Sequence, residues 1–229
     1  MHKLNLLDEF VLLSIDDTSG NYIISGVQFN YGLIGAALIE LGIQGKIELE
    51  GTQVIVRKNM PLKDRALSSI AQKLDQETKE LDLKKWLYNL QSEVKTVSDA
   101  ILDRLIKSSI LEVVHGKILW IFPTTKYPTE NPVPERKLKN RIREIVLDKR
   151  IATADELMLL SLIEATGLIQ EIFSKEERKQ AKETIKVLTE SNQISKELGE
   201  TIQTIQTVIM VTTNAAIMSA LTTTIITSN

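Results

Sequence analysis

Residues 4–50 constrain the fold most, because they combine helix, turn and strand signals in an unusual order. An amphipathic helix is expected over residues 3–15, with Leu4, Leu7 and Val11 along one side. The acidic turn 16–20 (DDTSG) follows, because Asp and Ser side chains bond local backbone and glycine accepts left-handed angles. Residues 22–24 then form a short extended run.

A second helix is expected over residues 30–43, where glycine and alanine allow a neighbouring helix to approach closely. The strands 46–50 and 53–57 come next, joined at Gly51 and Thr52 as a hairpin. Helix, strand, tight turn and strand recur later, with a helix over 97–107, strands at 110–114 and 117–122, and a His115–Gly116 turn. Two such units are the parts of a winged helix or of a generic helix-and-hairpin packing, and the sequence favours neither.

Composition limits the class of protein. The 229 residues are 43% hydrophobic and 25% charged, as in globular proteins, but only 4% are aromatic, so the core is aliphatic. A net charge of −2 gives no global attraction to nucleic acid or acidic lipid, so such binding requires a local patch. The absence of cysteine excludes disulfides and thiolate metal sites and suits a reducing cytosol. We expect a cytoplasmic protein.

The remaining segments are predicted to be helical or irregular. Helices are expected over 64–78 and 82–90, with Trp86 in the core, and four of the five prolines make 123–134 a connector or loop. Helices over 153–165 and 175–190 follow, the first capped by Thr153, with Gly167 as a break and Ser174 and Glu177 as a capping box. The fold class is therefore mostly α, a single domain over 1–229 with two or more small β-hairpins.

Residues 201–229 contain no charged side chain. A membrane span is possible by length, but Thr, Gln, Asn and Ser interrupt the run throughout. Apolar residues recur at helical spacing, so a packed terminal helix is favoured over a span.

The sequence contains no recognised catalytic motif. There is no HExxH, GxSxG or P-loop, and no glycine-rich dinucleotide motif follows a strand. His115 is expected in a solvated turn. The pair Asp16–Asp17 lacks the further carboxylates of a calcium loop, which favours a turn role over a metal site. We therefore expect neither enzymatic activity nor a cofactor or metal.

The basic segment 135–150 is the best candidate for binding. As a helix with Leu138 and Ile142 inward, it places Lys137 and Arg141 together along one border of the apolar stripe. The other cations, Arg136, Lys139, Arg143 and Arg150, fall toward the open side. Lys137 and Arg141 then either grip a phosphorylated head group or form ordinary surface ion pairs with Glu144 and Asp148.

The order of these motifs resembles the Golgi phosphoprotein 3 family. The resemblance is carried by LLDEFVLLSIDDTSG, GLIGAALIELGIQGKIELE, WLYNL, ILDRLIKSSILEVV, TKYP, REIVLDK and LLSLIEATGLIQEIF. It extends over nearly the whole chain from Leu4. It implies a mostly helical domain without catalysis that binds phosphatidylinositol 4-phosphate in a shallow basic pocket and acts as a peripheral adaptor. Golgi members also retain membrane enzymes through their cytoplasmic tails.

The resemblance also implies which residues form the ligand site. The basic residues of the family pocket match Lys137 and Arg141. A pocket tryptophan is matched by Ser25 and a pocket arginine by Ile34, so half of the family's pocket chemistry is absent. Each lost charge-assisted contact would weaken binding by roughly 1.5–3 kcal/mol.

The start of the chain and residues 150–156 add two expectations. The chain starts almost at the first helix, which resembles the shorter prokaryotic-type members, and residues 150–156 look too short for the family's self-association hairpin. The expected partner is an anionic lipid head group or membrane surface at the inner face. Alternatives are a protein-binding scaffold that has lost lipid binding and a winged-helix nucleic-acid binder. The helix over 30–43 has no Lys or Arg, which argues against nucleic acid.

Overall fold

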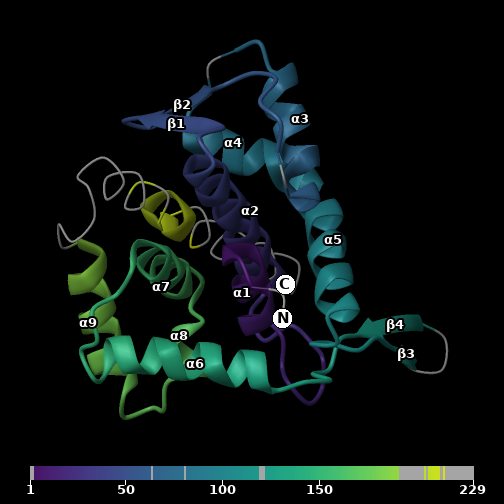
Figure 1. The fold of residues 1–229 in the computed structure, drawn as a ribbon, viewed down its shortest axis with the longest axis vertical. Coiled ribbons are helices and arrows are strands. Elements are labelled where there is room, and N and C mark those ends of the chain that lie inside the picture. Colours follow the sequence, from purple (N-terminus) through teal and green to yellow (C-terminus); the bar gives the residue numbers. More distant parts are fainter. Residues whose placement is uncertain are drawn as a thin grey trace, which may run out of the picture.

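The computed structural model describes residues 3–62, 64–79, 81–118, 122–190, 204, 206–211 and 214. These residues form nine α-helices, two 3-10 helices and two antiparallel two-stranded sheets, which confirms the mostly-α prediction (Figure 1). The helices are α1 Leu6–Leu13, α2 Gly26–Ile43, α3 Ser68–Gln76, α4 Leu83–Asn89, α5 Val94–Lys107, α6 Val133–Val146, α7 Ala154–Thr166, α8 Ile169–Ile172 and α9 Arg178–Glu190. The 3-10 helices are η1 Arg65–Leu67 and η2 Leu90–Glu93, and the strands are β1 Ile47–Glu50, β2 Gln53–Val56, β3 Val114–Ile118 and β4 Phe122–Lys126.

Helix α1 is shorter than the predicted 3–15 because a capping box fixes its first turn. The Asn5 side chain accepts a hydrogen bond from the Asp8 backbone N–H, and the Asp8 carboxylate accepts one from the Asn5 N–H. Seven of its eight residues are buried. Asp8 is among them, because it forms an ion pair with Arg104 of α5.

Helix α2 begins four residues before its predicted start. Ser25, directly after the predicted extended run 22–24, has extended backbone angles and serves as the N-cap, and its hydroxyl accepts a hydrogen bond from the Gln28 N–H. The helix is apolar around most of its circumference because it packs against α1, α5 and α7. By length and composition alone it is the one described helix able to cross a membrane, and 56% of it is buried inside the protein.

Two glycines of α2 let neighbouring helices approach its backbone. A Cβ at Gly32 would lie 2.4 Å from the Phe10 ring of α1 and 2.6 Å from the Thr166 methyl of α7. At Gly35 it would lie 2.2 Å from the Ile209 side chain. The predicted close approach is confirmed.

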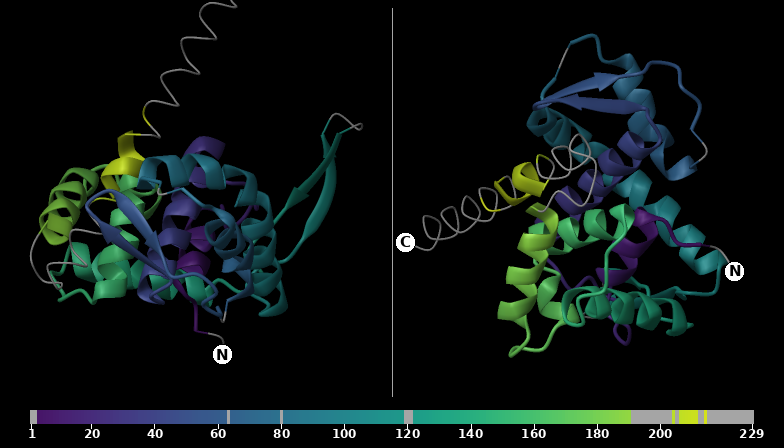
Figure 2. Two further views of the ribbon diagram at one scale, coloured as in Figure 1. Left: turned by 90° about the horizontal axis from the view of Figure 1, so that it is seen from above. Right: turned by 60° about the vertical axis from the view of Figure 1, so that its left-hand side comes forward.

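The first hairpin agrees with the prediction from the sequence, and the second differs from it. Strands β1 and β2 pair as predicted, with Glu50 opposite Gln53. The second hairpin is shifted toward the C-terminus: His115 and Gly116 lie in β3, opposite Thr125 and Thr124, so the predicted turn there is wrong. Pro123 lies in β4, which it can do because each strand of a two-stranded sheet is an edge. Figure 2 shows this hairpin standing out from the helical body.

In the second half of the chain, the predicted capping residues do mark the ends of helices. Thr153 caps α7 through a capping box with Glu156, and Gly167 ends it with φ of 79°. The Ser174 N–H donates to the Glu177 carboxylate, as the capping-box pattern predicts. Trp86 is buried, as expected.

The uncharged C-terminal segment lies largely outside the described residues. Where it is described, residues 206–211 are helical, and Ile209 is fully buried against Gly35 of α2. This contact agrees with a packed helix for that part of the segment.

We predict that Gly32→Ala destabilises the protein by about 1–3 kcal/mol, because the new methyl group must displace the Phe10 ring. Gly26→Ala is the matched control, since a Cβ there meets no atom within 4 Å. Urea unfolding followed by circular dichroism measures both. Equal stability of Gly32→Ala and the wild type would contradict the close packing.

Candidate functional site

The candidate site is built on α6, the basic helix. Leu138, Ile142, Ile145 and Val146 are buried, as predicted, so the charged side chains are distributed around the remaining faces. Pro132 and Pro134 stand at the start of the helix, where proline's missing N–H breaks no helical hydrogen bond. The helix begins at Val133, two residues before the predicted segment.

Arg141, one of the two predicted phosphate-binding cations, is engaged inside the protein. Its guanidinium lies 2.7 Å from the Glu9 carboxylate of α1 and 3.4 Å from that of Glu156 in α7. The expected partner Glu144 instead lies 3.7 Å from Arg150. Burial raises the pKa of Glu9, although Arg141 opposes the shift. Arg141 therefore joins three helices.

Two cations predicted to face the open side also have structural partners. The Arg143 guanidinium forms two hydrogen bonds with the Glu177 carboxylate, of 2.6 and 2.8 Å, and lies 5.7 Å from the centre of the Phe173 ring. These bonds lower the pKa of Glu177 to about 2. Lys139 lies 2.5 Å from Glu135 and 3.6 Å from Asp17. Both side chains, predicted to face the open side of the helix, are thus partly exposed and paired with carboxylates.

Lys137 and Arg136 differ from the other cations of α6. Both side chains are exposed, and neither forms an ion pair or side-chain hydrogen bond with any residue that the structure describes. The predicted pairing of Lys137 with Asp148 is absent among these residues. They are the cations of α6 that remain available to an external anion.

The other two predicted site residues lie elsewhere. Ser25 is exposed at the N-terminus of α2, whereas Ile34, in the middle of that helix, is 0% exposed. Helix α1 packs against both α2 and α6. Because Ile34 is buried, it does not lie on the surface where Lys137 is exposed. A ligand bound at α6 would therefore not contact the Ile34 side chain.

The acidic turn is attached to the start of α6 and contributes no metal site. The Asp16 carboxylate accepts the Ser19 N–H at 2.7 Å, and this bond lowers its pKa. Asp17 accepts the Thr129 hydroxyl at 2.7 Å. Among the described residues, no group of three or more His, Cys, Asp or Glu side chains is placed to hold a metal ion.

Glu135 is a buried carboxyl group that the sequence analysis missed. Burial, together with a hydrogen bond to Asp17 that favours the protonated form, raises the pKa of its carboxyl to about 8 despite Lys139. The carboxyl is therefore mostly neutral at pH 7. The sequence did contain a signal for its pairing with Lys139. Glu135 lies four residues before Lys139, and residues at this spacing are neighbours on a helix.

A cavity of about 560 Å³ lies beside the first turn of α2. Its aromatic walls come from Tyr22, Phe29 and Tyr127, and its polar groups include Ser98, Lys95 and Asp99. The Tyr22 hydroxyl lies 3.3 Å from the Ser98 hydroxyl, and Lys95 forms an ion pair with Asp99. The single cation in this lining is thus neutralised locally, so the cavity is a poorer anion site than the α6 surface.

A model of the Golgi phosphoprotein 3 (GPP34) family matches residues 6–205. The chain belongs to this family. The match extends from the first residue of α1 beyond the end of α9, so it includes the acidic turn, both hairpins and α6. The Golgi phosphoprotein 3 family is not known as a family of enzymes, and membership supports lipid or protein interactions in general terms.

We predict that Glu135→Gln flattens the pH dependence of stability. The pKa of Glu135 is near the ordinary value of 4.5 in the unfolded chain, and burial raises the pKa to about 8 in the folded protein. At this position the unfolded state thus binds fewer protons between these values, so the contribution of Glu135 to wild-type stability falls as pH rises from 4.5 to 8. Glutamine is neutral throughout, and its advantage over the wild type should grow across this range.

Urea unfolding at pH 5, 6, 7 and 8 tests this prediction, with Glu130→Gln, at an exposed position, as the control. The stability difference between Glu135→Gln and the wild type should increase in favour of the variant with pH. A difference that stays constant from pH 5 to pH 8 would show that Glu135 ionises normally.

Proposed function

We propose that the protein is a non-enzymatic peripheral adaptor that binds an anionic lipid surface through the exposed cations of α6. The proposal rests on a division among the cations of α6 in a member of the Golgi phosphoprotein 3 family. Arg136 and Lys137 have no partner among the described residues, whereas Arg141, Lys139 and Arg143 each pair with a carboxylate from another part of the chain. The protein acts in the cytoplasm, at the inner membrane face. Phosphatidylinositol 4-phosphate is the head group that the family resemblance implies.

The chemistry of the exposed pair suits a charge-dense head group. Arg136 and Lys137 are adjacent near the start of α6, and each basic residue close to an anionic bilayer contributes about 1 kcal/mol of attraction. This attraction decays over about one Debye length from the surface. Because that length shortens as the salt concentration rises, binding should weaken in higher salt. Arg141 contributes indirectly, by fixing α6 against α1 and α7.

A protein-binding scaffold is the second candidate, and the placement of Ile34 favours it. Because this side chain is fully buried and uncharged, it cannot replace the family pocket's arginine. A member with this substitution and with Ser25 in place of the tryptophan keeps the fold but has lost specific head-group contacts. Its binding partner would then be a protein.

We predict that Arg136→Glu/Lys137→Glu abolishes sedimentation with anionic vesicles at near-physiological salt. Losing two cations weakens membrane association by roughly 30-fold, and reversing them weakens it further. The matched control is Lys179→Glu/Lys182→Glu, which reverses two exposed cations on α9 and makes the same change in net charge. Circular dichroism confirms that both variants fold.

Two vesicle compositions separate the candidate ligands. Phosphatidylinositol 4-phosphate vesicles are compared with charge-matched phosphatidylserine vesicles. Selective binding that only the α6 variant loses supports a head-group site, and equal binding that it loses supports a general lipid-surface adaptor. Equal loss in both variants, or no binding by the wild type, contradicts the α6 site. The scaffold would then be the remaining candidate.

A further inference from the structure

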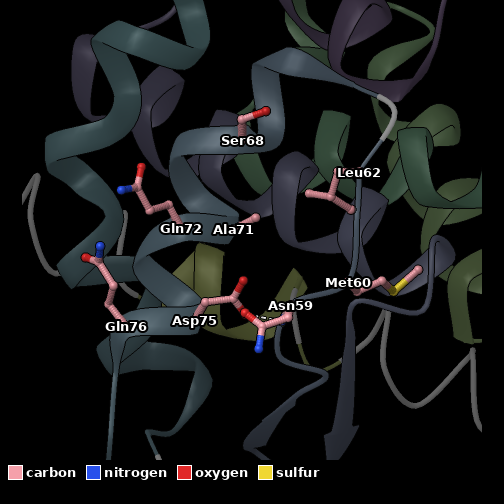
Figure 3. Close-up of a pocket in the computed structure, with 8 residues that line it drawn as sticks. All are labelled: Asn59, Met60, Leu62, Ser68, Ala71, Gln72, Asp75 and Gln76. Atoms are coloured by element: carbon pink, nitrogen blue, oxygen red, sulfur yellow. Dashed lines mark hydrogen bonds between the residues drawn. The ribbon is translucent and has the colours of Figure 1, made fainter.

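Glu135 differs from the other buried charged side chains in its hydrogen bonding. Among the described residues, the buried charged side chains are Asp8, Lys46, Glu135 and Glu156. The Lys46 ammonium donates to the Asp75 carboxylate at 2.6 Å and to the Arg57 carbonyl at 2.8 Å. Figure 3 shows Asp75 on α3 beside Asn59, whose N–H donates to the same carboxylate. Asp8 and Glu156 each accept bonds from an arginine and from a backbone N–H. For Glu135, no donor in the described part of the chain other than Lys139 reaches either carboxyl oxygen.

Two carboxyl groups share one cation at this position. The Lys139 ammonium lies 2.5 Å from the Glu135 carboxyl and 3.6 Å from that of Asp17 in the acidic turn. Glu135 is 2% exposed, so an uncompensated charge on it is strongly unfavourable. If both acids were ionised, the cluster of Glu135, Asp17 and Lys139 would carry one such charge. A proton on Glu135 removes it, and burial accordingly raises the pKa of this carboxyl to about 8.

The elements packed against α6 do not supply Glu135 with a second cation. Helix α6 packs against α1 and α9. Glu9 of α1 pairs with Arg141, and Glu177, just before α9, pairs with Arg143. The positive end of the helix dipole favours an ionised acid in the first turn, but burial opposes ionisation more strongly. The other two members of the cluster are therefore the charges that decide when Glu135 ionises.

The cluster lies where three segments of the chain meet. The Asp17 carboxylate accepts the Thr129 hydroxyl at 2.7 Å, and the Asp17 carbonyl accepts the Thr129 N–H at 3.0 Å. The Gly20 carbonyl accepts the Tyr127 N–H at 2.9 Å. Residues 127–131 lead directly into α6. The acidic turn is thus bonded to this connector, and the cluster joins both to the first turns of α6.

The cations of the proposed lipid site, Arg136 and Lys137, directly follow Glu135 in the chain. A negative charge added beside them reduces their attraction to an anionic surface. The negative surface potential of an anionic bilayer also attracts protons, which favours the neutral form of Glu135. Because linkage is reciprocal, proton binding and membrane binding then strengthen each other.

We propose that the protonated form of Glu135 holds the acidic turn against the start of α6 and binds anionic lipid more tightly than the ionised form. This inference rests on the proposed lipid site at Arg136 and Lys137. When Glu135 loses its proton, its carboxylate and that of Asp17 repel each other, the acidic turn separates from α6, and water reaches the buried group. The added negative charge and the less ordered first turn both lower the affinity for lipid.

Vesicle titrations at several pH values test the coupling. Mixed phosphatidylglycerol and phosphatidylcholine vesicles are used, because the phosphodiester of phosphatidylglycerol keeps its charge over this range. The wild-type Kd should rise about fivefold or more from pH 6.5 to pH 9, with half of the change near pH 8, since one unit charge is added near the surface. Glu135→Gln should keep the low-pH Kd throughout. The control Glu130→Gln, at an exposed position, should follow the wild type.

Asp17→Asn separates this mechanism from a general effect of pH. Without the second carboxylate, Lys139 balances Glu135 alone, so the change in Kd should move to lower pH. The amide oxygen of asparagine can still accept the Thr129 hydroxyl bond. A pH profile of Asp17→Asn identical to that of the wild type would overturn the proposal, and so would a Kd of Glu135→Gln that rises as steeply as the wild type's.

Hydrogen exchange without vesicles tests whether the acidic turn separates. The Tyr127 and Thr129 amides, which bond to that turn, should lose protection between pH 6.5 and pH 9 in the wild type and keep it in Glu135→Gln. Each rate is compared with that of an unstructured amide at the same pH. Unchanged protection in the wild type would contradict the separation.

The two measurements distinguish failure of this inference from failure of the lipid site. If the wild type binds vesicles with the same Kd at pH 6.5 and pH 9, the coupling is overturned and the lipid site stands. If the wild type binds no vesicle at either pH, the lipid site itself is wrong, and the coupling to it falls as well.

Discussion

The ion pairs of the adjacent acids Asp8 and Glu9 in α1 are the interactions on which the rest of the structure depends. Asp8, 0% exposed, lies 2.6 Å from the Arg104 guanidinium of α5, which also lies 2.9 Å from Asp64. Glu9 lies 2.7 Å from Arg141 of α6. One short helix is thus held between two others. Removing one partner of a buried pair costs about 3–5 kcal/mol, because a charge is left uncompensated.

These ion pairs explain why few cations of the basic helix α6 are unpaired. Arg141, Lys139 and Arg143 each meet a carboxylate from another part of the chain, in α1, the acidic turn or the residues before α9. The cations that fix α6 are therefore not the cations that can meet a ligand. Lys137 and Arg136 remain exposed on a helix whose position is already fixed, which favours binding because little ordering is required.

The sequence predicted the elements whose signals are local. Thr153 and Gly167 bound α7, Gly51 marks the first hairpin, and the apolar spacing of α6 identified its buried side. The second hairpin was misplaced because His115–Gly116 looked like a turn, whereas strand pairing decided the register. The partners of Arg141 were unpredictable, since Glu9 lies 132 residues away. The order of motifs identified the family, but it could not show that Ile34 is buried.

The most direct test of the central claim uses the absence of cysteine in the chain. A single cysteine replaces the exposed Asn140 of α6 or, as a control, Tyr88 of α4, which is 71% exposed. Figure 1 shows α4 in the upper part of the molecule beside β1 and β2, and α6 at the bottom. Each is labelled with an environment-sensitive fluorophore and titrated with anionic vesicles. The account predicts a blue shift at position 140 and none at 88. A shift at 88 alone would contradict the assignment of α6 as the membrane-facing surface.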